Sequence, residues 1–289
     1  MGLKESIKAK RNAARILRLR GGITKDMCGL EIGPSLRPVV AKREGFQVEI
    51  VDHLSKEELT EKYAAMGLDT SAIEEVDYIW DGRSYCELTG KSSYYDYIVA
   101  SHVIEHTPDL IAFLKDCSAM LKEGGILSLA VPDKRYTLDH FRTVTTVAEV
   151  IDQYLHKDSL GTVGTLCEYA LHVCKRGGRT AWAKELDSVI PKKYESVHDL
   201  EFARRLYHDA TEKPEFHDIH QHIFTPSSFR LLMAELRELE LTDFGIFLFH
   251  PTVSSEFVVQ LKKQLPFTPL SDAERRTLLR KASKENRIR

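Results

Sequence analysis

The sequence predicts an α/β fold in which helices cover both faces of a mostly parallel β-sheet. The first observation is that short apolar runs alternate with segments of helical periodicity between Met27 and Val131. The second is that this alternation stops after Val131 and that strand-like apolar runs return only at Phe244. The third is that the last two apolar runs are joined by a short link around Pro251, which indicates an antiparallel pair.

The predicted strands are nearly continuous apolar runs, which is typical of strands buried on both faces. They cover Met27–Ile32, Phe46–Val51, Val76–Trp80, Tyr97–Ser101, Ile126–Val131, Phe244–Phe249 and Phe257–Leu261. The predicted helices cover Lys56–Ala65, Asp109–Leu121, Val147–His156, Thr165–Lys175, Ala181–Leu186 and Ser227–Leu239, and the stretch Leu36–Glu44 has room for only a short helix. Together they predict a Rossmann-like, doubly wound sheet with an antiparallel last strand.

The chain between the fifth and sixth predicted strands is far longer than a normal crossover. We therefore expect a helical insert over residues 143–239, within a Rossmann-like domain formed by residues 26–142 and 240–265. Inserts at the carboxyl ends of strands usually form the substrate side of a site. A basic N-terminal helix over residues 1–25 and a basic C-terminal tail over residues 266–289 flank this domain.

Composition excludes several classes of protein. Among 289 residues, 43% are hydrophobic and 29% charged, which is ordinary for a globular chain. The net charge of -2 gives no general attraction to nucleic acid. No apolar run approaches the ~20 residues that span a bilayer, and the N-terminus lacks the apolar core of a signal peptide. The five scattered cysteines predict reduced thiols, and hence a cytoplasmic protein.

Positive charge is concentrated at the two ends of the chain. The N-terminal segment carries Lys4, Lys8, Lys10, Arg11, Arg15, Arg18 and Arg20 on an amphipathic helical pattern, and residues 275–289 are also basic. The first interpretation is a solvated helix packed on the domain. The alternative is peripheral contact with anionic lipid at the inner face of the membrane or with an anionic glycan carrier.

A nucleoside site is predicted at the ends of the first strands. The strand ending in Glu31 turns through Gly33, which allows close approach of a ligand to the backbone. Asp52 ends the second strand, nineteen residues after Gly33, where its carboxylate can accept hydrogen bonds from a ribose. This pattern alone fits a nicotinamide or flavin cofactor nearly as well.

Three further features favour S-adenosylmethionine. Pro34 and Ser35 stand where a pyrophosphate signature has its second glycine. Glu31 would oppose a diphosphate but suits the ammonium group of a methionine moiety. Asp81 ends the third strand, where it can accept from the adenine amino group. Three acids at successive strand ends predict a cationic nucleoside without phosphate.

Several segments together resemble class I S-adenosylmethionine-dependent methyltransferases. They are LEIGPS, VDHL, WDG, YDYIVASHVIEHTPDL and LKEGGILSLAVPDKR, within Met27–Arg135, and the last two strands extend the resemblance. The closest group has a hydrophobic-EH-x-PD segment after the fourth strand. The variant LEIGPS…KREGF…VDH…PDKRY also resembles methyltransferases encoded among bacterial surface-polysaccharide genes.

The resemblance implies a cofactor role for each matching position. It places Glu31, Gly33, Pro34 and Ser35 around the methionine moiety, Asp52 on the ribose, His53 and Leu54 beside the adenine, Asp81 and Gly82 at the adenine edge, and Ser101 and His102 on the sulfonium side. Ser35 replaces the second glycine that is usual in this family.

The acceptor side is predicted at the ends of the fourth and fifth strands and in the insert. A hydroxyl acceptor needs a base, and the candidates are His106, Asp133 and His222. The alternatives are that His106 only orients its loop, that Asp133 belongs to a helix-entry cluster, and that His220 and His222 lie in a polar surface loop. The segment His217–His222 holds three histidines and an acid.

A divalent ion bound by His102, Glu105, His106 and either His220 or His222 is a further alternative. Imidazole and carboxylate ligands suit zinc better than magnesium. The chain resembles family members in which an ExxEH segment and a distal histidine hold metal, with His102 in place of the first acid. From the sequence alone we favour a site without metal.

The sequence therefore predicts transfer of a methyl group from S-adenosylmethionine to a hydroxyl oxygen. A sugar of a surface polysaccharide or glycoconjugate is the expected acceptor, because buried hydroxyls need the paired donors and acceptors that a His- and Asp-rich side provides. The alternatives are a small-molecule acceptor such as a quinone, lipid or natural-product precursor, a nicotinamide-dependent oxidoreductase or epimerase, and a non-catalytic relative of the same fold.

Overall fold

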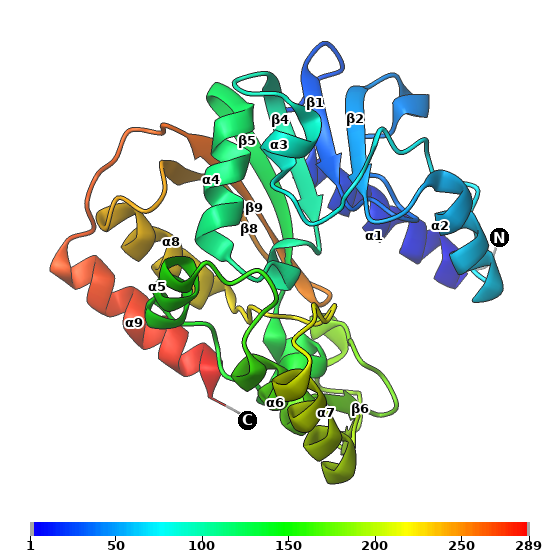
Figure 1. The fold of residues 1–289 in the computed structure, drawn as a ribbon, viewed down its shortest axis with the longest axis vertical. Coiled ribbons are helices and arrows are strands. Elements are labelled where there is room, and N and C mark those ends of the chain that lie inside the picture. The colour runs from blue at the N-terminus through cyan, green and yellow to red at the C-terminus, as the bar shows by residue number, and fades with distance from the viewer. Residues whose placement is uncertain (1–2, 288–289) are drawn as a thin grey trace.

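A seven-stranded sheet with strand order β3-β2-β1-β4-β5-β9-β8 forms the centre of the computed structural model, which describes residues 3–287, with side chains from residue 9 (Figure 1). Its strands are β1 (Cys28–Ile32), β2 (Gln47–Asp52), β3 (Tyr78–Ile79), β4 (Tyr95–Ser101), β5 (Leu121–Pro132), β8 (Phe244–Val253) and β9 (Glu256–Lys263). The first five strands are parallel, whereas β9 runs antiparallel to both β5 and β8. The predicted fold, including its antiparallel last strand, is confirmed.

The helices begin where the sequence supplies capping side chains. They are α1 (Leu3–Leu19), α2 (Lys56–Ala65), α3 (Tyr85–Thr89), α4 (Leu110–Met120), α5 (Val147–His156), α6 (Val163–His172), α7 (Leu200–Glu212), α8 (Pro226–Glu238) and α9 (Asp272–Asn286). Ser55 and Thr146 form capping boxes at α2 and α5, so both helices have the predicted bounds. The short crossover holds only a 3-10 turn at Lys42–Glu44, as expected.

Helices cover both faces of the sheet, and the alternation of side chains along β4 shows it. Ile98 and Ala100 join the larger core, to which α4 and α8 contribute. Tyr97 and Val99 point to the opposite face and pack in a second core that includes Leu19 at the end of α1. Burial on both faces explains why the strands are continuous apolar runs in the sequence.

The insert differs in part from the prediction. It contains a hairpin, β6 (Cys174–Arg176) with β7 (Tyr194–Ser196), and the helix α7, none of which is among the predicted elements. The predicted helix Thr165–Lys175 ends at His172, and Ala181–Leu186 holds only a 3-10 turn at Lys184–Leu186. The buried Arg176 side chain donates to the carbonyl oxygens of Asp187, Ile190 and Pro191, so tertiary bonds hold this segment as a loop.

Two parts of the insert lie in different places, and the C-terminal helix packs on one of them. In Figure 1, α6, α7 and β6 form a lobe beyond one end of the strands, while α9 runs beside α8. The predicted basic tail is therefore largely helical, and Glu285 accepts hydrogen bonds from the backbone and hydroxyl of Ser227. Lys4, Lys8 and Arg289 of the predicted basic ends lie outside the described side chains.

The described helices are too short or too polar to cross a bilayer.

Candidate functional site

A cleft of about 660 Å³ lies at the carboxyl ends of β1, β2 and β4. Six of the predicted cofactor residues line it: Gly33, Ser35, Asp52, His53, Gly82 and His102. The other five, Glu31, Pro34, Leu54, Asp81 and Ser101, are not among its lining residues. Of the predicted bases, His106 lines the cleft, whereas Asp133 and His222 do not.

The turn after β1 is fixed by its backbone geometry. Gly33 has φ 62°, and its amide donates to the carbonyl of Val51, 2.8 Å away. A Cβ atom at Gly33 would meet Val103 at 3.2 Å, so a side chain here would crowd the cleft. Ser35 also has a positive φ, 47°, and its amide donates to Asp52 Oδ2 at 2.9 Å. The turn and the end of β2 are therefore one hydrogen-bonded unit.

Asp52 is buried, yet its carboxylate retains capacity to accept. Oδ1 accepts from the backbone amide of His53 at 2.8 Å and lies 2.7 Å from His53 Nδ1. Oδ2 accepts only from Ser35. Because each carboxylate oxygen has two lone-pair directions, Oδ2 can take one further donor without rearrangement. We define the strand-end site as Gly33, Ser35, Asp52 and His53.

Glu31 acts on this site through the backbone. Its two oxygens accept from the amides of Val39 and Val40, at 2.6 and 3.0 Å. Burial raises the pKa of Glu31 to about 7, although the two amide bonds oppose that shift. The carboxylate is thus committed to holding the loop between β1 and β2.

Aromatic side chains that the sequence interpretation did not single out line the cleft beside the end of β3. Asp81 is half-exposed and pairs with Arg83, whose contact lowers the pKa of Asp81. Trp80 stacks on Tyr85, with ring centroids 6.2 Å apart, and meets Phe216 edge-on at 6.3 Å. Trp80, Tyr85 and Phe216 all line the cleft. Phe216 comes from the insert, so no local pattern around Trp80 could have indicated it.

The end of β4 is held by two elements distant in sequence. His102 has φ 57°, and its ring nitrogens lie 3.1 Å from Glu105 Oε1 and 2.7 Å from Glu256 Oε2. Burial lowers the pKa of His102, but the two carboxylates outweigh it and raise the value to about 10. Arg15 of α1 donates to Glu256 and to the hydroxyl of Ser101, each at 2.6 Å. Ser101 therefore anchors α1.

A second group of side chains meets at the edge of the same cleft. We call Glu105, His106, Asp218 and His220 the histidine cluster. His106 Nδ1 lies 2.8 Å from Asp218 Oδ1, and the rings of His106 and His220 are 4.8 Å apart at 89°. The contact with His106 lowers the pKa of Asp218. His106 and Asp218 line the cleft, so the cluster faces the strand-end site.

The backbone joins the two halves of this cluster. The amides of Gln221 and His222 both donate to the carbonyl of Glu105, at 2.6 and 3.0 Å. His220 Nδ1 lies 2.6 Å from Asp139 Oδ2, and Arg142 donates both to Asp139 at 3.0 Å and to the carbonyl of His220 at 2.8 Å. The insert loop is therefore fixed against the turn after β4.

The remaining predicted bases are engaged in the interior. Asp133 is buried and accepts from the side chains of Arg135, at 2.9 and 2.6 Å, and Thr252, at 2.6 Å. His222 is buried, and its burial lowers the pKa to about 4. Neither ring nitrogen of His222 has a hydrogen-bond partner among the described residues.

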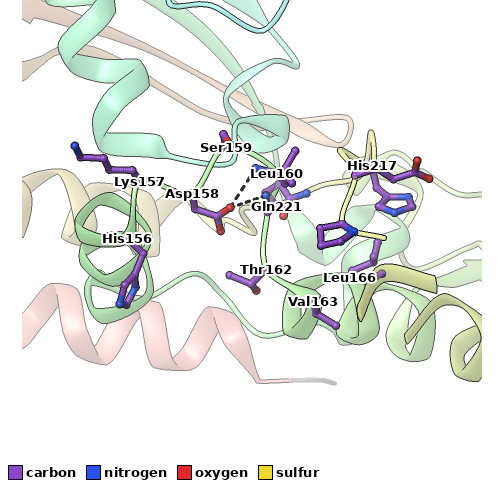
Figure 2. Close-up of a pocket in the computed structure, with 14 residues that line it drawn as sticks. His156, Lys157, Asp158, Ser159, Leu160, Thr162, Val163, Leu166, His217 and Gln221 are labelled. Carbon is purple, nitrogen blue, oxygen red and sulfur yellow. Dashed lines mark hydrogen bonds between the residues drawn. The ribbon is translucent and has the colours of Figure 1, made fainter. Parts of the chain in front are cut away.

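A smaller cavity of about 300 Å³ lies within the insert (Figure 2). Asp158 accepts there from the amides of Leu160 and Gly161, at 3.2 and 2.9 Å, which forms the tight turn drawn in Figure 2. His217 and Gln221 also line it. The loop that places Asp218 in the lining of the cleft thus also places His217 and Gln221 in the lining of a separate cavity.

A doubly wound sheet with a cleft at the carboxyl ends of its strands is typical of nucleoside-binding α/β proteins. The profile of a family described as a methyltransferase domain matches residues 5–237. The chain belongs to this methyltransferase family, and its activity is S-adenosylmethionine-dependent methyl transfer. S-adenosylmethionine, rather than a nicotinamide, is accordingly the cofactor.

Solved structures with similar folds share little sequence with this chain. A candidate zinc-dependent alcohol dehydrogenase from Rhodobacter sphaeroides is 13% identical, with 87% of this chain and 90% of that chain covered and a TM-score of 0.47. An S-adenosylmethionine-dependent methyltransferase from Methanosarcina mazei is 16% identical, with 84% of this chain and 95% of that chain covered and a TM-score of 0.42. One from Mesorhizobium loti is 13% identical, with 85% of this chain and 95% of that chain covered and a TM-score of 0.41. A search of curated proteins finds no match. The family assignment rests on the family profile.

Proposed function

We propose that this methyltransferase transfers the methyl group to a hydroxyl oxygen of a sugar, in a surface polysaccharide or a related glycoconjugate. The observation that carries the proposal is the histidine cluster at the edge of the cofactor cleft. A polyhydroxyl ligand that leaves water needs donors and acceptors for each hydroxyl, and the cluster offers both. A flat apolar acceptor would gain nothing from two histidines and two acids.

The strand-end site binds the cofactor in this proposal. The free direction on Asp52 Oδ2 accepts one ribose hydroxyl, and the half-exposed His53 ring swings away from Oδ1 to admit the other. Gly82 and the rings of Trp80 and Phe216 enclose the adenine. Glu31 contributes indirectly, because its carboxylate shapes the loop that carries the Gly33 turn.

The reaction is a displacement at the methyl carbon. The acceptor oxygen forms a bond to that carbon while the bond from carbon to sulfur breaks, and its electrons leave the sulfur neutral. The hydroxyl proton must depart as the oxygen becomes an ether, so a group beside the oxygen must favour its loss. Among His106, Asp133 and His222, we assign this activation to His106, because it alone lines the cleft.

Methyl transfer to a panel of acceptors tests the proposal. The purified chain is incubated with isotope-labelled S-adenosylmethionine and with oligosaccharides, quinols, lipids and amines, and the products are read by mass spectrometry. We expect label on a sugar oxygen. Label confined to nitrogen, carbon or a non-sugar hydroxyl would overturn the assignment of the acceptor.

His106→Ala provides the matched test of the site. We expect it to abolish transfer to the sugar while cofactor affinity, measured by calorimetry, stays unchanged. The exposed His208 in α7 supplies the control, because His208→Ala removes a histidine far from the cleft lining. Full activity in His106→Ala would show that another group activates the acceptor.

A further inference from the structure

The histidine cluster has the ligand geometry of a transition-metal site. A nitrogen of His106, a nitrogen of His220 and a carboxylate oxygen of Glu105 all lie within 4.8 Å of one another. Ligands of tetrahedral zinc stand roughly 3.4 Å apart, because each bond is about 2.0–2.2 Å long. Small side-chain rotations close that difference. We infer that Glu105, His106 and His220 bind one divalent transition ion, with zinc the best match.

The two histidines are oriented as metal ligands usually are. Asp139 engages Nδ1 of His220 at 2.6 Å, and Asp218 lies 2.8 Å from Nδ1 of His106. Each ring therefore has Nε2 left for a ligand bond. A carboxylate on the far nitrogen of a histidine fixes the tautomer and raises the basicity of the ligating nitrogen. His220 meets this arrangement through its hydrogen-bond contact with Asp139, and His106 through its ion-pair contact with Asp218.

Glu105 supplies the independent observation. Its side chain is fully buried, and Oε1 is contacted by His102 Nδ1 at 3.1 Å. Oε2 is buried and has no hydrogen-bond partner among the described residues. An unpaired carboxylate oxygen in the interior is costly, and a coordinated cation removes that cost. The unpartnered atom belongs to the residue that both histidines face.

The rest of the site is held before any ion arrives. The carbonyl of Glu105 accepts two amides of the insert loop, and Arg142 ties that loop to Asp139. Of the predicted metal ligands, His102 is engaged by two glutamates, and His222 is not part of the cluster of converging ligand atoms. On this arrangement we propose the three-residue metal site in place of the metal-free site favoured from the sequence alone.

Three protein ligands leave a coordination position open, as in catalytic zinc sites. Since His106 also lines the cleft, an ion bound there would be reached from the cleft. The role of the ion rests on the proposed function: the acceptor hydroxyl binds at the open position, and its proton passes to water in the cleft. The oxygen then attacks the methyl carbon, and the electrons of the broken carbon–sulfur bond return to sulfur. Lewis-acid activation of this kind requires no separate base.

Metal binding is measured first without cofactor or acceptor. The full chain is stripped with a chelator and titrated with zinc, and separately with magnesium, by calorimetry and elemental analysis. We expect one zinc per chain and no comparable magnesium binding, because magnesium prefers oxygen ligands. The inference would be overturned if the unmodified chain bound no more zinc than the His220→Ala variant does. Comparison with this variant subtracts zinc held by the free cysteines.

Variants separate coordination from folding. His106→Ala and His220→Ala should lose the bound zinc, whereas His217→Ala, in the same loop but outside the cluster, should keep it. Asp218 is an exposed residue, so Asp218→Asn should fold normally and weaken zinc binding about 10- to 100-fold. The inferred site would be overturned if Asp218→Asn and His106→Ala both bound zinc as tightly as the unmodified chain does.

The two proposals fail in different ways. Zinc binding at the cluster without sugar methylation would refute the proposed acceptor and leave the metal site standing. Sugar methylation by a chelator-treated, zinc-free chain would uphold the proposed function and overturn the role of the ion in activating the acceptor, while the zinc titration decides whether the site exists.

Discussion

The strand-end site and the histidine cluster border the same cleft but are built by different means. Gly33, Ser35 and Asp52 lie close in sequence and are brought together by the pairing of β1 with β2. Glu105 and His106 meet His220 across more than a hundred residues, through a loop of the insert. The comparison teaches that the sheet dictates the geometry of the proposed cofactor side, whereas the geometry of the proposed acceptor side depends on how the insert folds.

Arg142→Met should have the largest effect, because it destabilises the insert loop that carries the acceptor side of the comparison. The Arg142 side chain is buried between Asp139 and Glu168, at 3.0 and 3.2 Å, so its loss leaves Asp139 buried beside fewer positive partners. We expect the free energy of unfolding to fall by about 3–5 kcal/mol in urea denaturation. The exposed pair of Arg205 and Glu201 provides a control, since Arg205→Met should cost about 0.5 kcal/mol or less. A small effect at Arg142 would show that the insert loop is held by other contacts.

Asp52→Ala should have the next largest effect, on the strand-end site alone. Loss of one or two charge-assisted hydrogen bonds to the ribose costs about 2–4 kcal/mol, or roughly 30- to 1000-fold in cofactor affinity by calorimetry. Asp52→Asn, which preserves shape, should lose affinity in the same direction. Asp81→Ala removes a half-exposed acid that does not line the cleft, so it should change cofactor affinity much less than Asp52→Ala does. Unchanged affinity in Asp52→Ala would place the ribose elsewhere.

Glu31, which holds the loop beside the strand-end site, should make the stability of the folded chain depend on pH. Its pKa in the folded chain is raised to about 7 from an ordinary value of 4.5, so the folded state binds the proton more tightly than the unfolded state. The resulting stability is fully present below pH 4.5 and is lost as the pH rises through 7. The loss is at most about 3 kcal/mol, at 1.36 kcal/mol per pKa unit. Glu31→Gln should remove this slope from denaturation curves measured between pH 4 and 8.

The opposite slope would be equally informative about Glu31. The amides of Val39 and Val40 favour the ionised carboxylate. A gain in stability above pH 4.5 would show that these bonds outweigh burial.

Gly33→Ala should have the smallest effect on stability, and it tests the turn after β1 in the strand-end site. An alanine at φ 62° costs about 1–2 kcal/mol, and its Cβ would also press on Val103. Gly67 has φ 71° with open space around it, so Gly67→Ala measures the backbone strain alone. We expect urea denaturation to show a larger loss for Gly33→Ala, and cofactor affinity to fall only in that variant. Equal losses would mean that Val103 moves aside freely.

The sequence was sufficient for the elements whose signals are local. Continuous apolar runs and Pro108 located most of the strands and α4 within a few residues, but β5 begins at Leu121 rather than at Ile126 and includes the glycine pair at Gly124. The turn at Gly33 and the acid at Asp52 could be placed because parallel strands end at one edge of the sheet. The residues implied for the cofactor remain predictions, although six of them line the cleft.

The sequence was insufficient where distant contacts decide the structure. Nothing near Glu31 indicates that its carboxylate binds two backbone amides rather than facing the cleft. The same holds for Arg15 and Glu256, which reach the end of β4 from opposite ends of the chain. The hairpin β6–β7 is short and polar, and it follows from the bonds of buried Arg176.

The position of β9 also sets an order of events during synthesis. Because β9 lies between β5 and β8, strand β5 leaves one side of its backbone unpaired until Glu256 and the residues after it have emerged. More than a hundred residues separate Pro132 from Glu256, which is on the order of ten seconds of translation at ~5–20 residues per second. The nascent chain therefore passes through a period in which an apolar strand edge is open to other chains, and a chaperone that shields it would act before β9 arrives.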